Sequence, residues 1–273
     1  MKPSFSKWAA LALCVAANWG YGTRAQSLSV TNSLQLWLKA DAGITTNAAG
    51  HVTGWNDQSG KNNHAAQTDE TLAPALVANA LNAKPVLRFD GTDDYLEVPD
   101  SDSLSITGDI TTFFVVNFDD FATFRAVWAK TAGNQPGPND WYALPTSGLP
   151  RAYRGDGTGQ NLGSVDGGSA LRAKSYLVVG WDMAGTTLTH YLAAQPTGSG
   201  PLTATVGDAE TSLLIGTRGD QFTKMKGDIA EILGNWVRSE WRLNNELSKL
   251  LIIRHFFATD CGALPPDRFS GAD

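Results

Sequence analysis

The chain has 273 residues and a formal net charge of −6 at pH 7, and 42% of its residues are hydrophobic. This acidic balance argues against nucleic acid or an anionic membrane as the main partner, because both are bound through an excess of Lys and Arg. The length and the hydrophobic share are sufficient for one large β domain or for two small ones.

Residues 1–25 are typical of a secretory signal peptide. Lys2 and Lys7 flank the start of an apolar run, and residues 23–25 form a cleavage site of the small-residue kind. The run is too short to span a bilayer, and no later segment approaches the ~20 apolar residues of a transmembrane helix. We therefore expect cleavage after Ala25 and a secreted or periplasmic protein. Cleavage would remove Lys2, Lys7 and Arg24 and no acidic residue, so the formal charge of the remaining chain would be −6 − 3 = −9.

Only one of the two cysteines, Cys261, would remain after this cleavage. An intrachain disulfide is then impossible, although the compartment would permit one. The fold therefore has to be stabilised by its hydrophobic core.

Short β-type runs separated by turn residues recur along the chain. Leu34–Leu38 alternates apolar and other side chains, and Asp109–Phe118 is apolar on both faces, as expected for a central strand. The strands do not alternate with helical segments, which argues against a parallel α/β sheet and favours an all-β sandwich. The other expected strands are 86–89, 95–98, 124–130, 141–144, 151–153, 176–181, 187–193 and 212–215.

Two of these runs lie within Lys84–Pro99, on either side of Asp90–Asp94. The sequence Asp-Gly-Thr-Asp-Asp between them has turn composition and disfavours a helix. This pattern predicts a β-hairpin.

One helix is expected near the C-terminus. Ser239 can cap it, and leucines recur at helical spacing from Leu243 to Leu251. The sequence has no internal repeat and no break in composition. We therefore predict one domain over residues 26–258, followed by a loosely ordered tail over 259–273.

Three stretches carry a family resemblance. They are Trp55–Ala65 (WNDQSGKNNHA), Pro85–Leu96 (PVLRFDGTDDYL) and Lys226–Leu233 (KGDIAEIL). Together they resemble the laminin G-like jelly-roll domains of the concanavalin A-like lectin/glucanase superfamily, over nearly the whole chain after the signal peptide. The resemblance implies a two-sheet antiparallel jelly-roll sandwich with a short C-terminal helix. Any binding site is then expected on the concave sheet face or on the loops at one rim.

The resemblance leaves the activity open. The superfamily includes sugar-binding modules, adhesion proteins and modules attached to secreted polysaccharide-degrading enzymes, and it also includes true hydrolases and lyases. Function therefore has to be inferred from the site.

A retaining glucanase of this superfamily would place its carboxylates on one strand as Glu-x-Asp-x-x-Glu, with two carboxyl groups about 5–5.5 Å apart. This chain has Asp228 and Glu231, but Lys226 stands where the nucleophile belongs. We expect Asp228 and Glu231 to be hydrogen-bonding residues of a strand, and we predict no catalytic residue here.

A lyase would need a base and a cation that neutralises charge, and His190 with Arg151 could supply them. His190 is in phase with Leu188 and Leu192, however, which is typical of a histidine at the edge of the core. We prefer the core interpretation.

Aspartates are oxygen ligands that suit calcium, so calcium is a possible cofactor of this chain. The spacing of the acidic residues does not match an EF-hand loop, and Asp-Gly turns need no metal because the Asp side chain bonds its own backbone. Turn chemistry is the preferred interpretation. The candidates are Asp57, Asp90, Asp93 and Asp94.

A sugar-binding surface needs exposed aromatic faces and planar polar side chains. Arg151 and Tyr153 share one face of a strand, and Trp141 faces out if Leu144 faces the core. With Tyr191 on a neighbouring strand, these side chains could form one stacking patch. The candidate ligand-binding residues are Trp141, Arg151, Tyr153 and Tyr191.

The favoured hypothesis is a secreted, non-catalytic carbohydrate-binding (lectin-like) or adhesion protein that binds polysaccharide on the concave sheet face. One alternative is a polysaccharide hydrolase or lyase on the same fold. The other is a structural module of a surface assembly.

Overall fold

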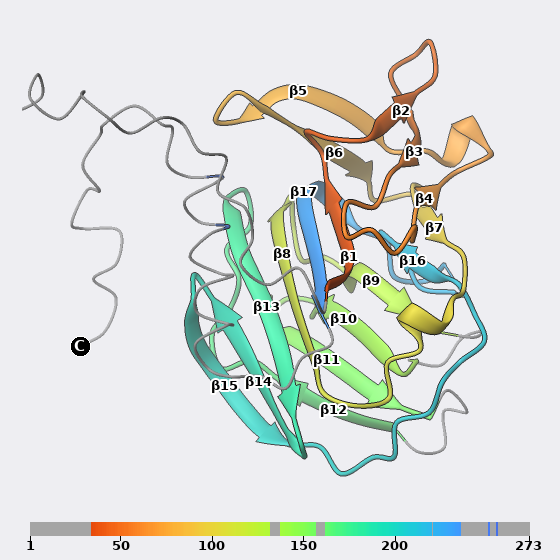
Figure 1. Ribbon diagram of the computed structural model, residues 1–273. Helices are drawn as coiled ribbons and strands as arrows, with labels where there is room; N and C mark the ends of the chain where they lie inside the picture. Colours follow the sequence, from red (N-terminus) through yellow and green to blue (C-terminus); the bar gives the residue numbers. More distant parts are fainter. Residues whose placement is uncertain are drawn as a thin grey trace, which may run out of the picture.

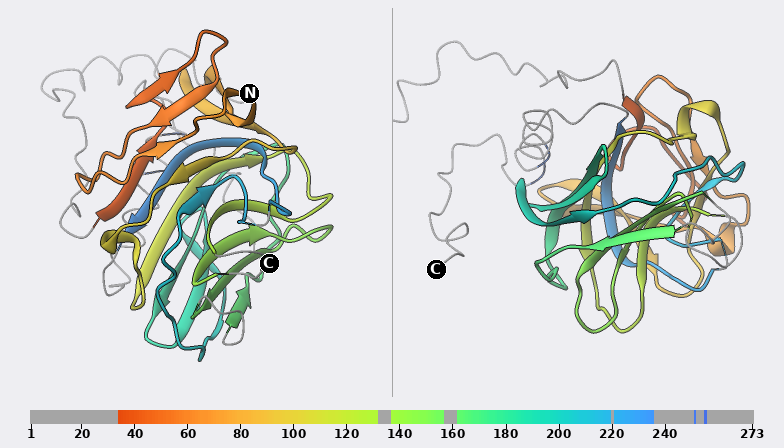
Figure 2. Two further views of the ribbon diagram at one scale, coloured as in Figure 1. Left: turned by 90° about the vertical axis from the view of Figure 1, so that its right-hand side faces the viewer. Right: turned by 90° about the horizontal axis from the view of Figure 1, so that it is seen from below.

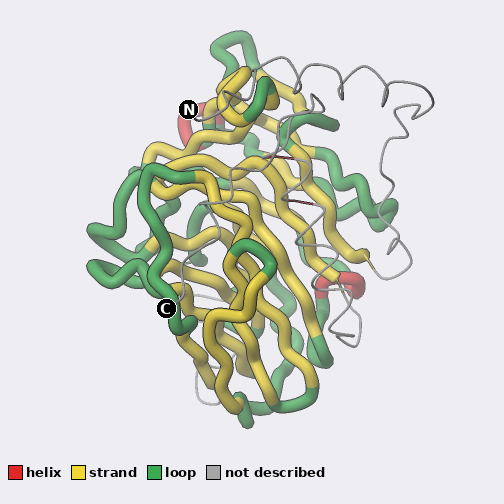
Figure 3. The backbone as a smooth tube through the Cα atoms, turned by 90° about the vertical axis from the view of Figure 1, so that its left-hand side faces the viewer, coloured by secondary structure: helices red, strands yellow, loops and turns green. Residues whose placement is uncertain are grey.

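Two antiparallel sheets packed face to face form a sandwich in the computed structural model, which describes residues 34–131, 137–156, 162–219, 221–235, 251 and 255 (Figure 1). This arrangement confirms the predicted all-β sandwich. Two 3-10 helices, η1 (Glu70–Leu72) and η2 (Asp102–Leu104), are short connectors (Figure 3). Among the described residues, no helix has the length and apolarity to cross a membrane.

The eight-stranded sheet has the order β15-β14-β13-β8-β17-β6-β5, and β1 also pairs with β17. The first described strand thus lies beside the last (Figure 1). The strands are β1 (Leu34–Lys39), β5 (Ala75–Leu81), β6 (Lys84–Asp90), β8 (Ile110–Phe118), β13 (Tyr176–Ala184), β14 (Thr187–Leu192), β15 (Gln195–Pro201) and β17 (Lys226–Asn235).

The nine-stranded sheet has the order β12-β11-β10-β9-β16-β7-β4-β3-β2. Figure 2 shows the strands curving around the space between the two layers. The strands are β2 (Ile44–Thr46), β3 (Val52–Trp55), β4 (Ala65–Ala66), β7 (Leu96–Val98), β9 (Arg125–Lys130), β10 (Asn139–Ala143), β11 (Pro150–Gly155), β12 (Leu162–Asp166) and β16 (Leu213–Ile215).

The main core lies between the sheets and is rich in aromatic side chains. Phe114 of β8 contacts two tryptophans of the opposite sheet, with ring centroids 5.4 Å from both Trp128 and Trp141. Edge-on and tilted ring pairs of this kind stabilise a core beyond the area they bury. The central strand β8 was predicted to be apolar on both faces, and eight of its nine residues are buried.

A second apolar cluster covers the outer face of the eight-stranded sheet. It includes Phe113, Val115 and Leu233, and Leu251 packs against it. Leu251 and His255 are each 2% exposed. The rest of the expected C-terminal helix, the signal peptide and the tail over 259–273 lie outside the described residues, so these features and the domain boundaries stay predictions.

The Lys84–Pro99 stretch is not a hairpin, and that prediction is wrong. β6 lies in the eight-stranded sheet and β7 in the nine-stranded sheet, so the segment between them crosses from one layer to the other. Asp90 Oδ1 accepts from Thr92 N at 2.7 Å, and Asp94 Oδ2 accepts from Asp90 N at 2.8 Å. The Asp side chains therefore stabilise a connection between the two sheets by the same backbone hydrogen bonds that were expected in a hairpin turn.

Polar side chains of the loop after β3 form hydrogen bonds with backbone groups. Asp57 accepts from the backbone N–H groups of Trp37, Ser59 and Asn63 at 2.9, 2.9 and 3.1 Å. Asn63 Nδ2 in turn donates to the carbonyl of Gln35 at 2.7 Å. The WNDQSGKNN motif thus holds this loop against β1 by hydrogen bonds. Asp57 therefore has a structural role.

The two sheets are joined along both sides of the sandwich. His190 of β14 is fully buried and its Nε2 lies 2.9 Å from the Val165 carbonyl of β12. On the other side, Val52 N donates to Pro74 O at 2.8 Å. His190 therefore occupies the core edge, as predicted, and satisfies backbone at a seam between sheets.

Candidate functional site

An aromatic patch lies on the outer face of the nine-stranded sheet, where β10 and β11 pair. Side chains at every second position share a face, and the register sets Tyr142 opposite Arg151 and Asp140 opposite Tyr153. We define the aromatic patch as Tyr142, Arg151, Tyr153 and Asp166 together with the loop residues Phe124, Arg218, Phe222 and Thr223.

Arg151 and Asp166 form a bidentate ion pair across β11 and β12. Arg151 Nη2 donates to Asp166 Oδ2 at 2.7 Å, and Nε donates to the other carboxylate oxygen. Arg151 Nη1 also donates to the Tyr153 hydroxyl at 3.2 Å. This arrangement raises the pKa of Arg151, mainly through Asp166, and holds the guanidinium and the phenol in fixed positions.

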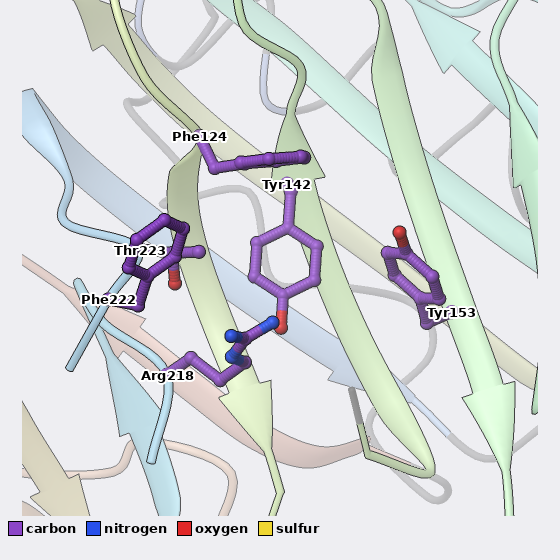
Figure 4. Close-up of a pocket in the computed structure, with 6 residues that line it drawn as sticks. All are labelled: Phe124, Tyr142, Tyr153, Arg218, Phe222 and Thr223. Atoms are coloured by element: carbon purple, nitrogen blue, oxygen red, sulfur yellow. The ribbon is translucent and has the colours of Figure 1, made fainter. Parts of the chain in front are cut away.

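A pocket opens on the same face and is lined in part by Tyr142 and Tyr153 (Figure 4). Its space is about 290 Å³ with the part open to solvent included. Phe222 is 70% exposed, whereas Tyr142 is 1% exposed beneath its neighbours. The lining residues are Phe124, Tyr142, Tyr153, Arg218, Phe222 and Thr223.

A buried hydrogen-bond chain supports the pocket from behind. Tyr142 donates its hydroxyl hydrogen to Asp140 Oδ2 at 2.6 Å, and Asp140 also accepts from the backbone N–H groups of Lys130 and Gly137 at 3.0 and 2.7 Å. Burial raises the pKa of Asp140 to about 6, while these hydrogen bonds and the charge of Arg218 oppose the rise.

The same chain keeps the Tyr142 phenol protonated. Burial and the neighbouring Asp140 carboxylate raise the pKa of Tyr142 well above its usual value. The guanidinium of Arg218 lies close to the Tyr142 hydroxyl (Figure 4), and its influence opposes this rise in pKa. The Tyr142 hydroxyl thus lies between the Arg218 guanidinium and the Asp140 carboxyl.

Two of the four predicted ligand-binding residues lie together in this patch. Arg151 and Tyr153 are on one face of β11, as expected, and both are half-buried. The structure shows where they lie, and their binding role stays a prediction.

Trp141 is not exposed, and that expectation is wrong. Its exposed fraction is 0%, and its ring stacks on Phe118 with centroids 6.3 Å apart. Ala143 shares its inward face, while Leu144 lies beyond the end of β10 and so gives no sign of the strand's orientation. The large indole takes the interior side because it buries the most apolar surface.

Tyr191 belongs to the other sheet and cannot join the patch. It lies on β14, is 8% exposed, and its ring centroid is 6.0 Å from that of Phe113. The expectation of one patch from all four residues is therefore wrong. Strands adjacent in sequence were assumed to be adjacent in space, but the chain passes to the other layer before β13.

Sequence reasoning missed the loop residues of the patch. Arg218, Phe222 and Thr223 lie between β16 and β17, and Phe124 precedes β9. Loops carry no periodicity that assigns a face to a side chain. A phenylalanine among polar loop residues, Phe222, was the one signal that the sequence offered, and it was not used.

Asp228 and Glu231 lie on the outer face of the eight-stranded sheet, each held by hydrogen bonds. Arg88 donates to both oxygens of Asp228 at 2.7 and 3.0 Å, and Tyr176 donates at 2.5 Å. Glu231 accepts from Trp37 Nε1 at 2.6 Å and lies 2.5 Å from His255 Nε2. The hydrogen-bonding interpretation is confirmed.

The predicted acidic candidates do not form one cluster. Carboxylate oxygens of Asp90, Asp93 and Asp94 lie within 4.8 Å of one another, whereas Asp57 is engaged in its own loop. Asp90 and Asp94 already accept backbone hydrogens of the turn. Their arrangement is accounted for by turn chemistry, and calcium binding stays a prediction.

The fold is a two-sheet antiparallel β-sandwich with an aromatic pocket on one outer face. Solved structures of similar fold include the ligand-binding domain of botulinum neurotoxin serotype D in complex with N-acetylneuraminic acid, with a TM-score of 0.60 at 12% identity. The alignment covers 83% of this chain and 53% of that chain. The binding domain of Paraclostridial mosquitocidal protein 1 gives a TM-score of 0.59 at 10% identity, over 81% of this chain and 53% of that one.

A third solved structure comes from botulinum neurotoxin type C, whose cell entry depends on interaction with two ganglioside molecules. Its TM-score is 0.59 at 10% identity, and the alignment covers 81% of this chain and 52% of that chain. The chain thus spans about half the length of these solved domains. At this identity the likeness establishes the fold alone. No protein-family model matches the chain, and no curated protein matches its sequence.

Proposed function

We propose that this chain is a secreted, non-catalytic carbohydrate-binding protein, lectin-like or adhesive, that binds a polysaccharide or other glycan at the aromatic patch. The observation that carries the proposal is that an exposed phenylalanine, Phe222, lines one pocket with the half-buried Tyr153, whose hydroxyl is held by the Arg151–Asp166 pair.

The chemistry of the patch suits a sugar. Pyranose rings present apolar C–H faces and a rim of hydroxyl groups, so they are recognised by ring faces with a few well-placed polar groups. Tyr153 and Phe222 provide the rings, and Arg151 with Asp166 provides donors and acceptors in fixed geometry. The patch replaces the predicted site, keeping Arg151 and Tyr153 and dropping Trp141 and Tyr191.

We infer that the chain belongs with the laminin G-like jelly rolls of the concanavalin A-like superfamily. The motif around Asp57 and the crossover around Asp90 both have structural roles in a sandwich of this kind, which supports the inference. That solved sandwiches of similar fold include binding domains for N-acetylneuraminic acid and gangliosides adds to the support.

The enzyme alternative gains no support from the acidic residues of β17. Asp228 and Glu231 are 1% exposed, and both are engaged by neighbouring side chains. A glycosidase needs two carboxyls that flank the scissile bond. The binding hypothesis therefore agrees better with the described residues.

The test is depletion of the purified protein from solution by insoluble cellulose, chitin, xylan, pectin and alginate, with release of reducing or unsaturated ends followed in the same samples. We expect binding to at least one polymer without product. Product release would overturn the non-catalytic assignment, and absence of binding to every polymer would overturn the proposal.

Two variants locate the site. Arg151→Ala removes the cation of a half-buried ion pair in the patch, and Lys84→Ala removes the cation of a similar pair with Asp41 at 2.7 Å on the other sheet. We expect Arg151→Ala to weaken binding about tenfold, the equivalent of ~1.4 kcal/mol, and Lys84→Ala to leave it unchanged. Equal effects of both variants would place the site elsewhere.

A further inference from the structure

Two loops that lie far apart in the sequence contribute rings to the pocket of the aromatic patch. Phe124 ends the connection between β8 and β9, and Phe222 lies in the connection between β16 and β17. Figure 4 shows both rings beside Tyr142. Tyr142 and Tyr153 are fixed by the pairing of β10 with β11, but strand pairing does not set the position of a loop residue. Other contacts must therefore determine how Phe124 and Phe222 lie relative to one another.

The guanidinium of Arg125 joins these two loops. Arg125 follows Phe124 directly and is 5% exposed. Its Nε donates to the Asp120 carbonyl at 3.3 Å and its Nη2 donates to the Asp120 carboxylate, both within the first loop. Its Nη1 donates to the Lys224 carbonyl at 3.2 Å, just after Phe222 in the second loop. We call Arg125, Asp120 and the Lys224 carbonyl the loop clamp.

Asp120 makes further bonds between the same two segments of the chain. Its carboxylate accepts from Lys226 Nζ at 3.2 Å, and the backbone N–H of Asp119 donates to the Lys226 carbonyl at 3.0 Å. Burial raises the pKa of Asp120, but hydrogen bonds from Arg125, Ala122 and Lys226 outweigh it and lower the pKa to about 2. The carboxylate is therefore charged at neutral pH and pairs with two cations.

Each loop also has an anchor that does not involve the loop clamp. In the first loop, the Phe121 carbonyl accepts from Thr146 N at 2.8 Å, and the Phe121 ring packs against Phe118 with centroids 5.4 Å apart. In the second, Met225 N donates to the Gly216 carbonyl at 2.7 Å. We therefore expect loss of the loop clamp to change how the two loops lie relative to one another, while both stay attached to the sheets.

We propose that Arg125 and Asp120 are positioning residues of the aromatic patch, an inference that rests on the proposed glycan-binding function. Neither is among the residues that line the pocket, so they act through the rings that they hold in place. Phe222 is 70% exposed, and packing therefore restrains it little. The loop clamp fixes its loop beside Phe124 before a ligand arrives. Rings that are ordered in advance lose less conformational freedom on binding, which raises affinity.

The first test needs no ligand and follows 4-fluorophenylalanine at position 222 by fluorine NMR. Asp120→Asn removes the carboxylate charge, and Arg125→Lys keeps the cation but cannot reach all three acceptors with one ammonium group. In both variants we expect the fluorine resonance to narrow and to shift toward its position in the urea-unfolded protein. The control Asp41→Asn removes the carboxylate of the Lys84–Asp41 pair on the other sheet and should leave the resonance unchanged.

The second test measures binding to the polysaccharide that depletes the wild-type protein from solution. We expect Asp120→Asn to weaken this binding about three- to tenfold. In a Phe222→Ala background the same substitution should have no further effect, because a positioning residue acts through the ring that it positions. In an Arg151→Ala background its effect should persist, since Arg151 is held by Asp166 and does not depend on the loop clamp. A general loss of folding would instead weaken binding in both backgrounds.

The outcomes separate this inference from the proposed function. An unchanged fluorine resonance in both Asp120→Asn and Arg125→Lys would overturn the inference and leave glycan binding intact. Full affinity in Asp120→Asn, or a loss that persists in the Phe222→Ala background, would overturn it as well. Absence of binding to every polymer would overturn the proposed function, and the fluorine result alone would then decide whether the loop clamp positions Phe222.

Discussion

The outer faces of the two sheets follow the same strand alternation but differ in what covers them. On the eight-stranded sheet, Phe113, Val115 and Leu233 form an apolar cluster against which Leu251 packs. On the nine-stranded sheet, the aromatic patch is open, and Phe222 is exposed. An apolar residue is therefore buried in a cluster on the first face, whereas on the second Phe222 remains exposed to solvent.

The polar groups on the two faces differ in the same way. Asp228 and Glu231 on the covered face are saturated by Arg88, Tyr176, Trp37 and His255. The open face instead has an Arg–Asp pair whose side chains are 28% and 37% exposed. The buried carboxylates of the covered face are satisfied within the fold, as buried polar groups usually are, whereas the Arg–Asp pair of the open face is within reach of solvent.

The largest expected difference in unfolding free energy is between two single variants, each of which removes one phenylalanine side chain from one of the two faces. Phe113→Ala should lower the free energy of unfolding by about 3–5 kcal/mol, because the ring is 1% exposed within an apolar cluster. Phe222→Ala should change it by less than about 0.5 kcal/mol. Urea unfolding of both variants measures the difference. Similar losses in the two variants would contradict the contrast between the faces.

The next effect concerns the chain of hydrogen bonds beneath the patch. Tyr142→Phe removes the hydroxyl that donates to the buried Asp140 at 2.6 Å, and the carboxyl keeps two backbone donors. We expect a loss of about 1–3 kcal/mol in unfolding free energy. The matched variant Tyr153→Phe, whose hydroxyl is nearer to solvent, should lose much less. A larger loss in Tyr153→Phe would show that Asp140 does not depend on Tyr142.

The apolar patterns along the chain predicted the sandwich well, because they indicate which side chains are buried. The apolar run of Asp109–Phe118 was read as a central strand, and β8 does lie between β13 and β17 with apolar material on both sides. β15, with the sequence QPTGSGP, was not predicted, because its Gly and Pro residues disfavour a strand in sequence terms. Pairing with β14 and contact with β12 supply the stabilisation that its own residues lack.

The candidate site was predicted only in part. Which side chains share a sheet face depends on how the strands pair, and the sequence does not give the pairing. Arg151 and Tyr153 are two residues apart on one strand, so alternation alone places them together. Tyr191 lies in the other sheet, and Trp141 lies on the inward face of β10. Neither the sheet to which a strand belongs nor the face that points inward can be read from the sequence alone. Phe222 and Thr223 come from a loop, where position depends on the whole fold.

A smaller effect depends on pH and concerns His190 at the seam between the sheets. Burial lowers the pKa of His190 in the folded state below 6.5, against opposing contributions from the Val165 carbonyl and Asp166. The folded protein therefore binds fewer protons than the unfolded chain. Stability is complete above pH 6.5 and falls as the pH decreases below it, by at most about 1.4 kcal/mol per pH unit from this group.

The variant His190→Gln isolates this contribution. Urea unfolding between pH 7.5 and 5 should show a stability difference between wild type and variant that shrinks on acidification. A difference that stays constant over this range would mean that His190 does not remain neutral in the folded protein.

The smallest expected effect on stability is that of Arg151→Lys, and it separates binding from folding. The Arg151–Asp166 pair has side chains that are 28% and 37% exposed, so its contribution to unfolding free energy should be about 0.2–1 kcal/mol. Lysine keeps the charge but cannot hold Asp166 bidentately while donating to Tyr153. Unfolding should therefore change little, while glycan affinity measured by calorimetry should fall about three- to tenfold.

Arg151→Lys also tests the mode of the proposed binding at the open face. If charge alone attracted the ligand, the substitution would leave affinity unchanged, and the patch would act as an electrostatic surface. Loss of affinity with stability retained would show that the planar geometry of the Arg–Asp–Tyr array is what the ligand reads. The covered face offers the opposite control, because its bidentate Arg88–Asp228 pair has a similar geometry on the other sheet. Arg88→Lys should therefore leave glycan affinity unaltered.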